Sequence, residues 1–166
     1  MVRVIGLDLG TTMGYAWTDT GAVVGEQSGT MDFRPKRHEG GGFRYIRFKS
    51  ALHELCEGSD EAVIFYEEVV YHRGADASHV YGGFMAVLHA FGDEHGVGYS
   101  GVPIGTIKKR ATGSGRADKG AMVRAAMREW SVDATHDQAD AMWVLQCGLD
   151  SLHGRVVEEK SDDAWR

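Results

Sequence analysis

The chain has 166 residues, of which 43% are hydrophobic and 25% charged, as in an ordinary soluble globular protein that can bury a core. No stretch approaches the roughly 18 to 20 apolar residues of a membrane span, and the first residues lack the layout of a signal peptide. Its cysteines, Cys56 and Cys147, have no metal-type spacing, so we expect a reduced, cytoplasmic protein with no membrane partner.

The net charge of −6 by itself argues against a nucleic-acid partner, but the charges are unevenly distributed along the chain. Segment 108–128 carries seven basic residues and one acid, and segment 34–47 carries five basic residues and one acid. These locally positive segments could still bind a nucleic acid, so such a partner is not excluded by the net charge.

Apolar runs and turn residues divide the chain into a regular series of elements. Strands are expected at 2–8, 14–19, 22–32, 62–66 and 97–102, and helices at 43–56, 80–94, 119–130 and 137–152. A polar loop is expected at 72–78. This order predicts an α/β three-layer fold, with a mixed five-stranded sheet and helices on both faces. We expect one domain at 1–154 and a charged, flexible tail at 155–166.

Asp8 is a carboxylate at the end of the first strand, which is otherwise apolar. A buried carboxylate is costly unless it is paired, hydrogen-bonded or bound to a metal ion. Taken alone, Asp8 fits either a catalytic group or a cap of the turn that follows, and the other acids decide between these.

Glu67 and Glu68 end the fourth strand in the same way. If this strand lies beside the first and parallel to it, Asp8 and a glutamate emerge at one edge of the sheet. Strand alternation sends only one of the two glutamates inward. Glu67 is the candidate site residue and Glu68 a possible auxiliary group. The pair also fits the solvated start of a loop.

Asp137 and Asp140 open the last helix, and their i, i+3 spacing places them on one helical face. Asp137 alone fits a first-turn or N-cap acid, whereas Asp140 precedes an apolar run on the face expected to be buried. His136 lies four residues before Asp140 and is a further candidate for the same site.

Asp8, Glu67, Asp137 and Asp140 would repel one another strongly at one site unless divalent metal occupied it. Oxygen ligands without cysteine spacing suit Mg²⁺ or Mn²⁺ rather than zinc. Two such ions about 4 Å apart can activate a water and stabilise the leaving oxygen of a phosphodiester. The combination predicts a metal-dependent hydrolase with two ions in its active site.

The basic segment after residue 107 supplies candidates for phosphate binding. The backbone amides of a Gly-Ser-Gly turn can approach a phosphate, and a helix beginning at Lys119 adds its dipole. The candidate DNA contacts are Lys108, Lys109, Arg110, Gly113, Gly115, Arg116, Lys119 and, just beyond Glu67, Arg73 with Tyr71 and His72. A solvated basic face is the alternative. The basic connector at 34–42 fits either a surface loop without a role or an arm that meets phosphate.

With these residues assembled, the chain resembles the RuvC family of Holliday junction resolvases, in particular its phage-type members. The resemblance covers residues 4–149 and lies in Ile5-Gly6-Leu7-Asp8-Leu9-Gly10 with Gly14-Tyr15, Phe65-Tyr66-Glu67-Glu68-Val69, Lys108-Lys109 through Gly113-Ser114-Gly115 to Lys119, and Asp137-Gln138-Ala139-Asp140. It implies the RNase H-like fold, four metal-binding catalytic carboxylates, and DNA contacts at Lys109 and Lys119. The Glu-x-Val pattern of the family selects Glu67 rather than Glu68 as one of these carboxylates. Leu9 stands where cellular members commonly have proline, and the turn to Gly14 is shorter.

The resemblance further implies a homodimer acting on four-way DNA, because two strands must be cut symmetrically. The helix at 80–91, with Met85, Val87 and Leu88, is a candidate dimer face or simply core. The function implied is resolution of Holliday junctions by paired, symmetric nicks, in the bacterial host if the protein is phage-encoded.

Three other functions compete with junction resolution. A broader nuclease of the same fold would cut forks and flaps, and a non-catalytic DNA-binding module would have lost a carboxylate that this chain retains. The Asp8-Leu9-Gly10-Thr11-Thr12 run also resembles the first phosphate motif of the actin and sugar-kinase ATPases, but that fold needs two related domains, for which 166 residues is too short.

Overall fold

The structure, a computed structural model, describes residues 1–19, 24, 27–70 and 74–162, with side chains as far as residue 154. Tyr71, His72 and Arg73, which the sequence marks as possible DNA contacts, lie outside these residues. The elements are β1 (Val2–Asp8), β2 (Thr12–Asp19), β3 (Gln27–Asp32), α1 (Phe43–Cys56), β4 (Glu61–Glu68), α2 (Ala75–His95), β5 (Gly98–Pro103), α3 (Ile104–Thr112), α4 (Lys119–Trp130) and α5 (His136–Asp162).

The strands form one five-stranded sheet in the order β3-β2-β1-β4-β5. The first three strands pair antiparallel, as the short turns between them require. β4 lies parallel to β1 and to β5, with α2 as the crossover between β4 and β5. The predicted mixed sheet, with β1 and β4 as parallel neighbours, is confirmed.

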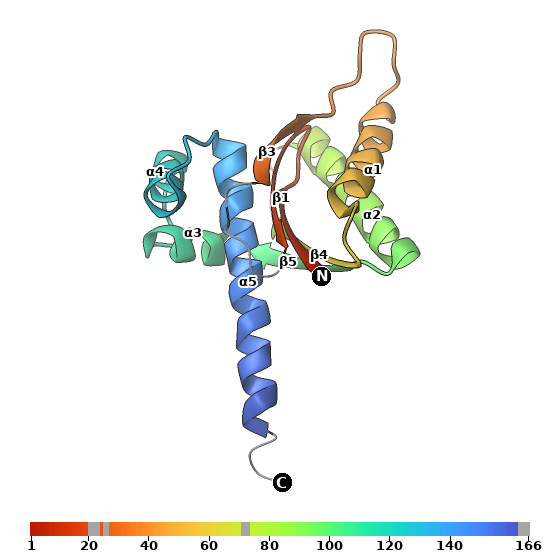
Figure 1. Ribbon diagram of the computed structural model, residues 1–166. Helices are drawn as coiled ribbons and strands as arrows, with labels where there is room; N and C mark the ends of the chain where they lie inside the picture. The colour runs from red at the N-terminus through yellow and green to blue at the C-terminus, as the bar shows by residue number, and fades with distance from the viewer. Residues whose placement is uncertain (20–23, 25–26, 71–73, 163–166) are drawn as a thin grey trace.

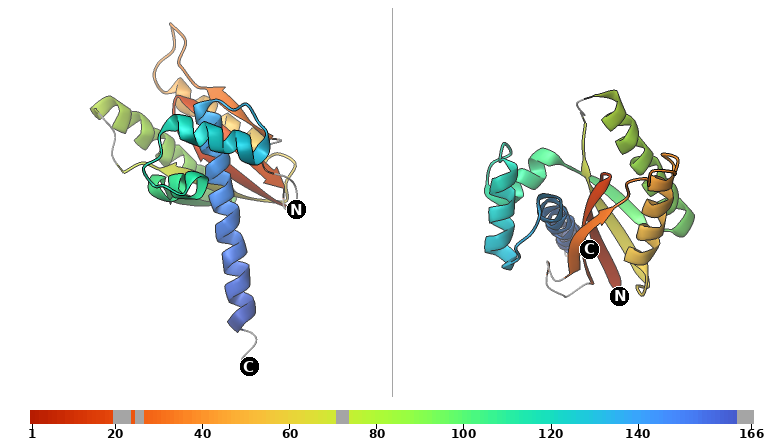
Figure 2. Two further views of the ribbon diagram at one scale, coloured as in Figure 1. Left: turned by 90° about the vertical axis from the view of Figure 1, so that its left-hand side faces the viewer. Right: turned by 90° about the horizontal axis from the view of Figure 1, so that it is seen from above.

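Helices cover both faces of the sheet, as predicted (Figure 1). Viewed from above, α1 and α2 lie on one side of the strands, and α3, α4 and α5 lie on the other (Figure 2). Alternation along β1 sends Val4 into the core beneath α4 and α5, and Ile5 and Leu7 into the core beneath α1 and α2. β1 is therefore buried on both sides and holds its last residue firmly at the sheet edge.

Three helices differ from the sequence prediction, whereas β2, β4 and β5 differ only by one or two residues at their ends. Of the strand predicted at 22–32, residues 22, 23, 25 and 26 lie outside the described residues. α2 begins at Ala75, inside the segment predicted as a loop, and α3 was not predicted at all. α3 is short and basic, but Ile104 and Ile107 have helical spacing directly after Pro103, a residue that starts helices well. α5 continues to Asp162, through residues 155–162 of the predicted tail, and this end of α5 projects from the body of the molecule (Figure 1).

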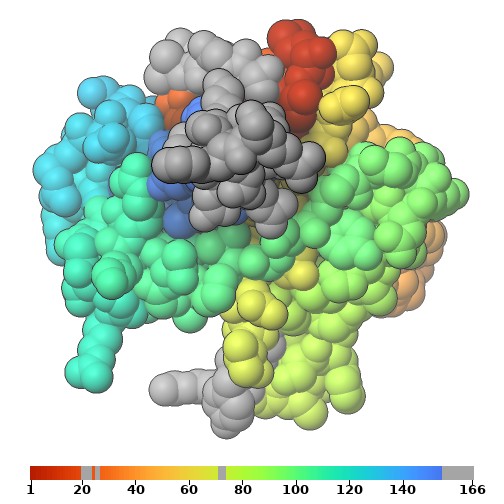
Figure 3. All heavy atoms as spheres, turned by 90° about the horizontal axis from the view of Figure 1, so that it is seen from below, coloured from red at the N-terminus to blue at the C-terminus, as the bar shows by residue number. Residues whose placement is uncertain are grey.

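The amino ends of β1 and β4 emerge together at the edge seen in Figure 3. There Arg3, only 7% exposed, donates to the Asp19 carboxylate at 2.9 and 3.1 Å and to the carbonyls of Leu55 and Glu57 at 3.1 and 2.7 Å. Its guanidinium also lies over the Trp17 ring, 3.8 Å from the centroid. This buried charge is fully compensated by the fold.

Candidate active site

The carboxyl ends of β1 and β4 bring two acids side by side. Leu7 pairs with Tyr66 in the parallel register, so the next residues, Asp8 and Glu67, leave the sheet at the same edge. Glu67 is only 8% exposed, whereas Glu68 lies on the exposed side of the strand. Alternation has therefore turned Glu67 inward, as predicted.

The start of α5 crosses these strand ends at very close range. Gly6 and Gly14 allow the approach, because a Cβ atom on Gly14 would collide with the Asp137 carbonyl and one on Gly6 with the backbone at Ala141. Two glycines in neighbouring strands thus set the position of the helix that carries Asp137 and Asp140.

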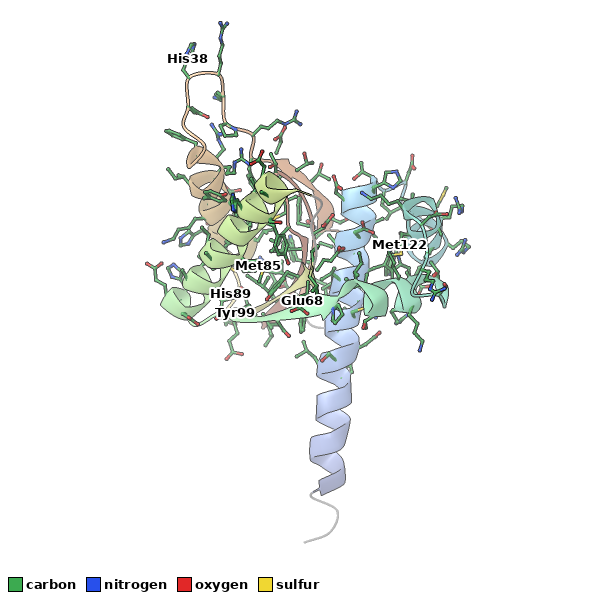
Figure 4. All side chains as sticks on the ribbon, turned by 180° about the vertical axis from the view of Figure 1, so that it is seen from behind. His38, Glu68, Met85, His89, Tyr99 and Met122 are labelled. Carbon is green, nitrogen blue, oxygen red and sulfur yellow. The ribbon has the colours of Figure 1, made fainter. Side chains whose placement is uncertain are left out.

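Asp8, Glu67 and Asp140 meet in one small cavity of about 130 Å³. Its other lining residues come from α3 and α4: Ile104, Ile107, Lys108, Lys119 and Met122. Met122 can be located on α4 in Figure 4. The cavity is acidic on the side of the sheet and α5, basic where the two lysines lie, and apolar beneath.

Burial and mutual repulsion raise the pKa of each acid in the cavity. The pKa of Asp8 is raised well above its usual value, first by burial and then by the charges of Glu67, Asp140 and Asp137, while Lys119 acts against these. Burial and Asp140 raise the pKa of Glu67 to about 7. Burial also raises the pKa of Asp140. Asp137 does not line the cavity, but its charge reaches both aspartates in it.

The fit of these residues to a metal ion rests on what the carboxylates lack. Within residues 1–19, 24, 27–70 and 74–154, no hydrogen-bond donor and no cation within ion-pair distance compensates the side chains of Asp8, Glu67 or Asp140. The same residues contain no ready-made cluster of three His, Cys, Asp or Glu ligands. Glu67 is buried, and Asp8 and Asp140 are half-buried. Oxygen donors of one sign without such partners match a hard divalent cation that would draw them together.

The two lysines at the cavity are Lys108 and Lys119, from α3 and from the first residue of α4. Lys109, which the family resemblance favours, is exposed and does not line the cavity. The helical geometry of α3 instead places Lys108 at the cavity. Arg110 points elsewhere, because its Nε donates to Asp150 at 2.6 Å and its guanidinium lies 5.9 Å from the Trp143 ring centroid.

The other predicted site residues surround the cavity. Gly113 ends α3 with a positive φ of 80°, and Gly115 packs near the Gly105 carbonyl. Arg116 is exposed next to them, and His136 is exposed at the start of α5, where its charge acts on Asp140. Arg73 lies outside the described residues.

Tyr81 is a further residue at the site that the sequence pattern gave no reason to select. Its hydroxyl donates to the Glu67 carbonyl at 2.9 Å and accepts from the Val69 N–H at 3.1 Å. One side chain of α2 thus ties down both backbone groups that flank the end of β4. A tyrosine at the expected core face of α2 was the only available signal.

The mixed sheet, the helices on both faces and the acids at one edge define an α/β protein with the RNase H-like fold, a fold that RuvC structures share. Thermus thermophilus RuvC superposes with a TM-score of 0.73 at 17% identity, covering 92% of this chain and 96% of that chain. The yeast mitochondrial Holliday junction resolvase Ydc2 superposes with a TM-score of 0.58 at 10% identity, covering 87% of this chain and 76% of that chain. No family model matches the chain.

Sequence similarity narrows this class to one family. The crossover junction endodeoxyribonuclease RuvC of Halorhodospira halophila is 32% identical over 154 residues, which is 89% of this chain and 89% of that protein. The chain belongs to the RuvC family of crossover junction endodeoxyribonucleases.

Proposed function

We propose that this chain is a metal-dependent, structure-selective endonuclease that resolves Holliday junctions by paired, symmetric nicks. Membership of the RuvC family makes it a hydrolase of DNA phosphodiester bonds. The observation that carries the proposal is the cavity in which uncompensated Asp8, Glu67 and Asp140 face Lys108 and Lys119.

The proposed cofactor is a pair of Mg²⁺ or Mn²⁺ ions held by Asp8, Glu67, Asp137 and Asp140. When bound, such ions supply an activated water and stabilise the charge that develops on the leaving oxygen of a phosphodiester. The raised pKa values of Asp8, Glu67 and Asp140 support this, because burial and mutual repulsion disfavour their ionised forms more than Lys108 and Lys119 favour them. Asp8 would be central to holding the ions, since the charges of all three other acids act on it.

The remaining residues of the cavity orient the substrate and limit water. Lys108 and Lys119 offer positive charge within reach of a scissile phosphate and lower the repulsion among the acids. Ile107 and Met122, 1% and 2% exposed, form a dry floor under them and strengthen each charge interaction there. Tyr81 holds the end of β4 so that Glu67 stays directed at the same point.

The proposed substrate is four-way or otherwise branched DNA. T. thermophilus RuvC in complex with a Holliday junction substrate superposes with a TM-score of 0.66 at 16% identity over 87% of this chain and 91% of that chain, which supports a common fold for this task. Lys109, Arg116 and the turn at Gly113 and Gly115 are the proposed contacts around the cavity, because they are exposed beside Lys108.

A homodimer is proposed as the active assembly, since two equivalent strands are cut in a roughly two-fold substrate. Leu88, with Phe84 and Phe91, is fully buried in the core, so α2 can offer a partner only its outer side. That side carries half-buried Met85, next to His89 stacked on Tyr99 of β5 at 4.5 Å between ring centroids (Figure 4).

No helix in the described part of the chain is long and apolar enough to cross a membrane. We propose that the protein acts in the bacterial cytoplasm, in keeping with its bacterial relative. The assignment to the phage-type members stays a prediction from the motifs.

A gel cleavage assay with MgCl₂ tests the proposal on a four-way junction, a fork and a linear duplex of one sequence. We expect paired nicks at symmetric positions in the junction and an intact duplex, with Asp8→Asn as the inactive control. Cleavage of the fork at the same rate as the junction would replace junction resolution with general debranching of DNA. No cleavage of any substrate by the wild-type protein would contradict an active nuclease.

A further inference from the structure

The loop between β3 and α1 stands out from the body of the molecule at the end remote from the C terminus (Figures 1 and 2). His38 lies near its far end (Figure 4). A chain running out and back over residues 33–42 reaches at most about 17 Å. The catalytic cavity does not use this loop, although the loop is one of the two basic segments of the chain.

The tip of the loop is a built turn held by its only acid. Glu39 accepts from the Lys36 N–H at 2.7 Å, and its own N–H donates to the Lys36 carbonyl at 2.9 Å. The Arg47 guanidinium, from α1, donates to the same carboxylate at 2.6 Å, and these contacts lower the pKa of Glu39. The carboxylate of Glu39 is therefore already paired within the protein and stabilises the shape of the loop.

The base of the loop is fixed in the same manner. Arg34 forms an ion pair with Asp32 at 3.0 Å, and Arg47 donates to the Arg34 carbonyl at 3.0 Å. Within the described residues, the side chains of Lys36, Arg37 and His38 have no hydrogen bond or ion pair, and all three are exposed. A preformed turn thus displays uncompensated positive charge at its tip.

The loop starts next to the catalytic edge of the sheet. The Phe33 N–H donates to the Thr11 carbonyl at 2.8 Å, and Arg44 of α1 donates to the Thr11 hydroxyl at 3.3 Å. Thr11 lies three residues after Asp8, at the entrance to β2. A groove of about 500 Å³ opens beside it, lined by Leu9, Gly10, Thr11, Arg44, Asp76, Ala77, Val80 and Tyr81.

The two basic segments flank the carboxylates from opposite faces of the sheet. Lys108 and Lys119 come from α3 and α4, whereas the loop leads into α1 on the other face. DNA presents one phosphate charge per about 1.7 Å of duplex axis, so a strand entering the cavity continues as charged backbone on either side. The positive charge of the loop makes this face of the sheet the favoured path for the DNA strand beyond the cavity.

We propose that the loop at 34–42 is a second DNA-contact surface, whose Lys36 and Arg37 bind the sugar-phosphate backbone of a duplex arm of the branched substrate. The proposal rests on the proposed function and adds to it a contact outside the active site. A preformed turn binds with little ordering cost, which suits phosphate contacts that fix the position of an arm without reading its sequence.

The test is a titration of a fluorescent four-way junction at several salt concentrations, in an Asp8→Asn background that leaves the DNA intact. Each lost phosphate contact lowers the slope of log K against log salt by about 0.9, so Lys36→Ala/Arg37→Ala should lower it by about 2. Two exposed charge contacts are together worth at most about thirtyfold in affinity at low salt. The matched control Lys36→Arg/Arg37→Lys keeps the charge and should bind as the background does.

A second control, Lys49→Ala, removes a charge that is paired with Glu94 at 2.8 Å on α2 and should leave the salt slope unchanged. A slope and affinity unchanged by Lys36→Ala/Arg37→Ala, in a protein that still binds the junction, would overturn the loop contact and leave the proposed function standing. Failure of the background protein to bind any branched DNA would instead overturn the proposed function. Circular dichroism confirms that each variant is folded.

Discussion

The two ends of β1 bury opposite charges in opposite ways. At the amino end, Arg3 has a carboxylate, two backbone carbonyls and an aromatic face as partners. At the carboxyl end, Asp8 faces further acids, and its pKa is raised. One strand, buried on both sides over most of its length, thus carries one compensated and one uncompensated charge.

This difference separates a structural charge from a functional one. Arg3 ties β1 to β2 and to the end of α1, and burial of a charge is tolerable there because every direction is satisfied. Asp8 has no such partners among the described residues. Carboxylates that the fold holds close together attract cations, because a cation relieves their repulsion. The comparison predicts that changes at one end affect stability and at the other end activity.

The largest effect is expected from Asp8→Asn. It removes a proposed metal-binding carboxylate and should lower the cleavage rate on the order of 10³-fold or more, while junction binding is kept or strengthened because repulsion of phosphate falls. Single-turnover cleavage and a binding titration measure the two effects separately. Full activity of this variant would contradict a catalytic role for Asp8 and, with it, the contrast between the two ends of β1.

The neighbouring glutamates provide a matched pair for the same measurement. Glu67→Gln should reduce cleavage to a similar extent, whereas Glu68→Gln, on the exposed side of β4, should retain most of the activity. The reverse order would mean that the active protein uses the other face of the strand end.

Arg3→Ala should destabilise the protein by about 3 kcal/mol, since it leaves the Leu55 and Glu57 carbonyls and the Asp19 carboxylate without their buried donor. Urea unfolding measures the loss, and Asp19→Asn should recover part of it by removing the orphaned charge. We expect the cleavage rate per folded molecule to stay near that of the wild type. A loss of rate without a loss of stability would contradict the structural role.

The acids at the carboxyl ends of β1 and β4 should make the metal-free protein less stable as the pH rises. The pKa of Glu67 is about 7 in the fold against a usual value of 4.5, so the unfolded chain releases this proton first. Stability therefore falls between about pH 4.5 and 7, by on the order of 3 kcal/mol. Thermal unfolding in EDTA should show this trend, and Mg²⁺ should reverse it at pH 7.5 more than at pH 5. A Mg²⁺ effect that does not depend on pH would contradict the assignment.

The smallest effect is expected from Tyr81→Phe. Loss of the hydroxyl breaks its bonds to the Glu67 carbonyl and the Val69 N–H, which should cost about 1 kcal/mol. We expect a decrease of a few-fold, roughly 3- to 10-fold, in the cleavage rate without a change in junction affinity, since 1.4 kcal/mol corresponds to tenfold. A change in affinity with an unchanged rate would show that Tyr81 contacts DNA instead of positioning Glu67.

Local patterns were sufficient for the parts of the fold in which hydrophobic periodicity and tertiary burial agree. The bounds of α1 and α4 follow directly from amphipathic spacing and turn residues, and β1 from its apolar run. Strand alternation predicted that only one of Glu67 and Glu68 points inward, and the Glu-x-Val pattern of the family resemblance selected Glu67. The sequence pattern did not predict α3, because its basic residues and short length resemble a solvated loop. Only the packing of Ile107 into the core shows why this segment is a helix.

The sequence by itself predicted the order of the elements except for α3, and it selected Asp8, Glu67 and Asp140, which meet in the cavity, because both follow from periodicity and from spacing along the chain. Only the tertiary structure decided that Lys108 rather than Lys109 lines the cavity, that Arg110 is taken by Asp150, and that Arg3 is a buried structural charge. These outcomes depend on the direction of a helical face and on partners distant along the chain. A linear pattern carries no information about such distances.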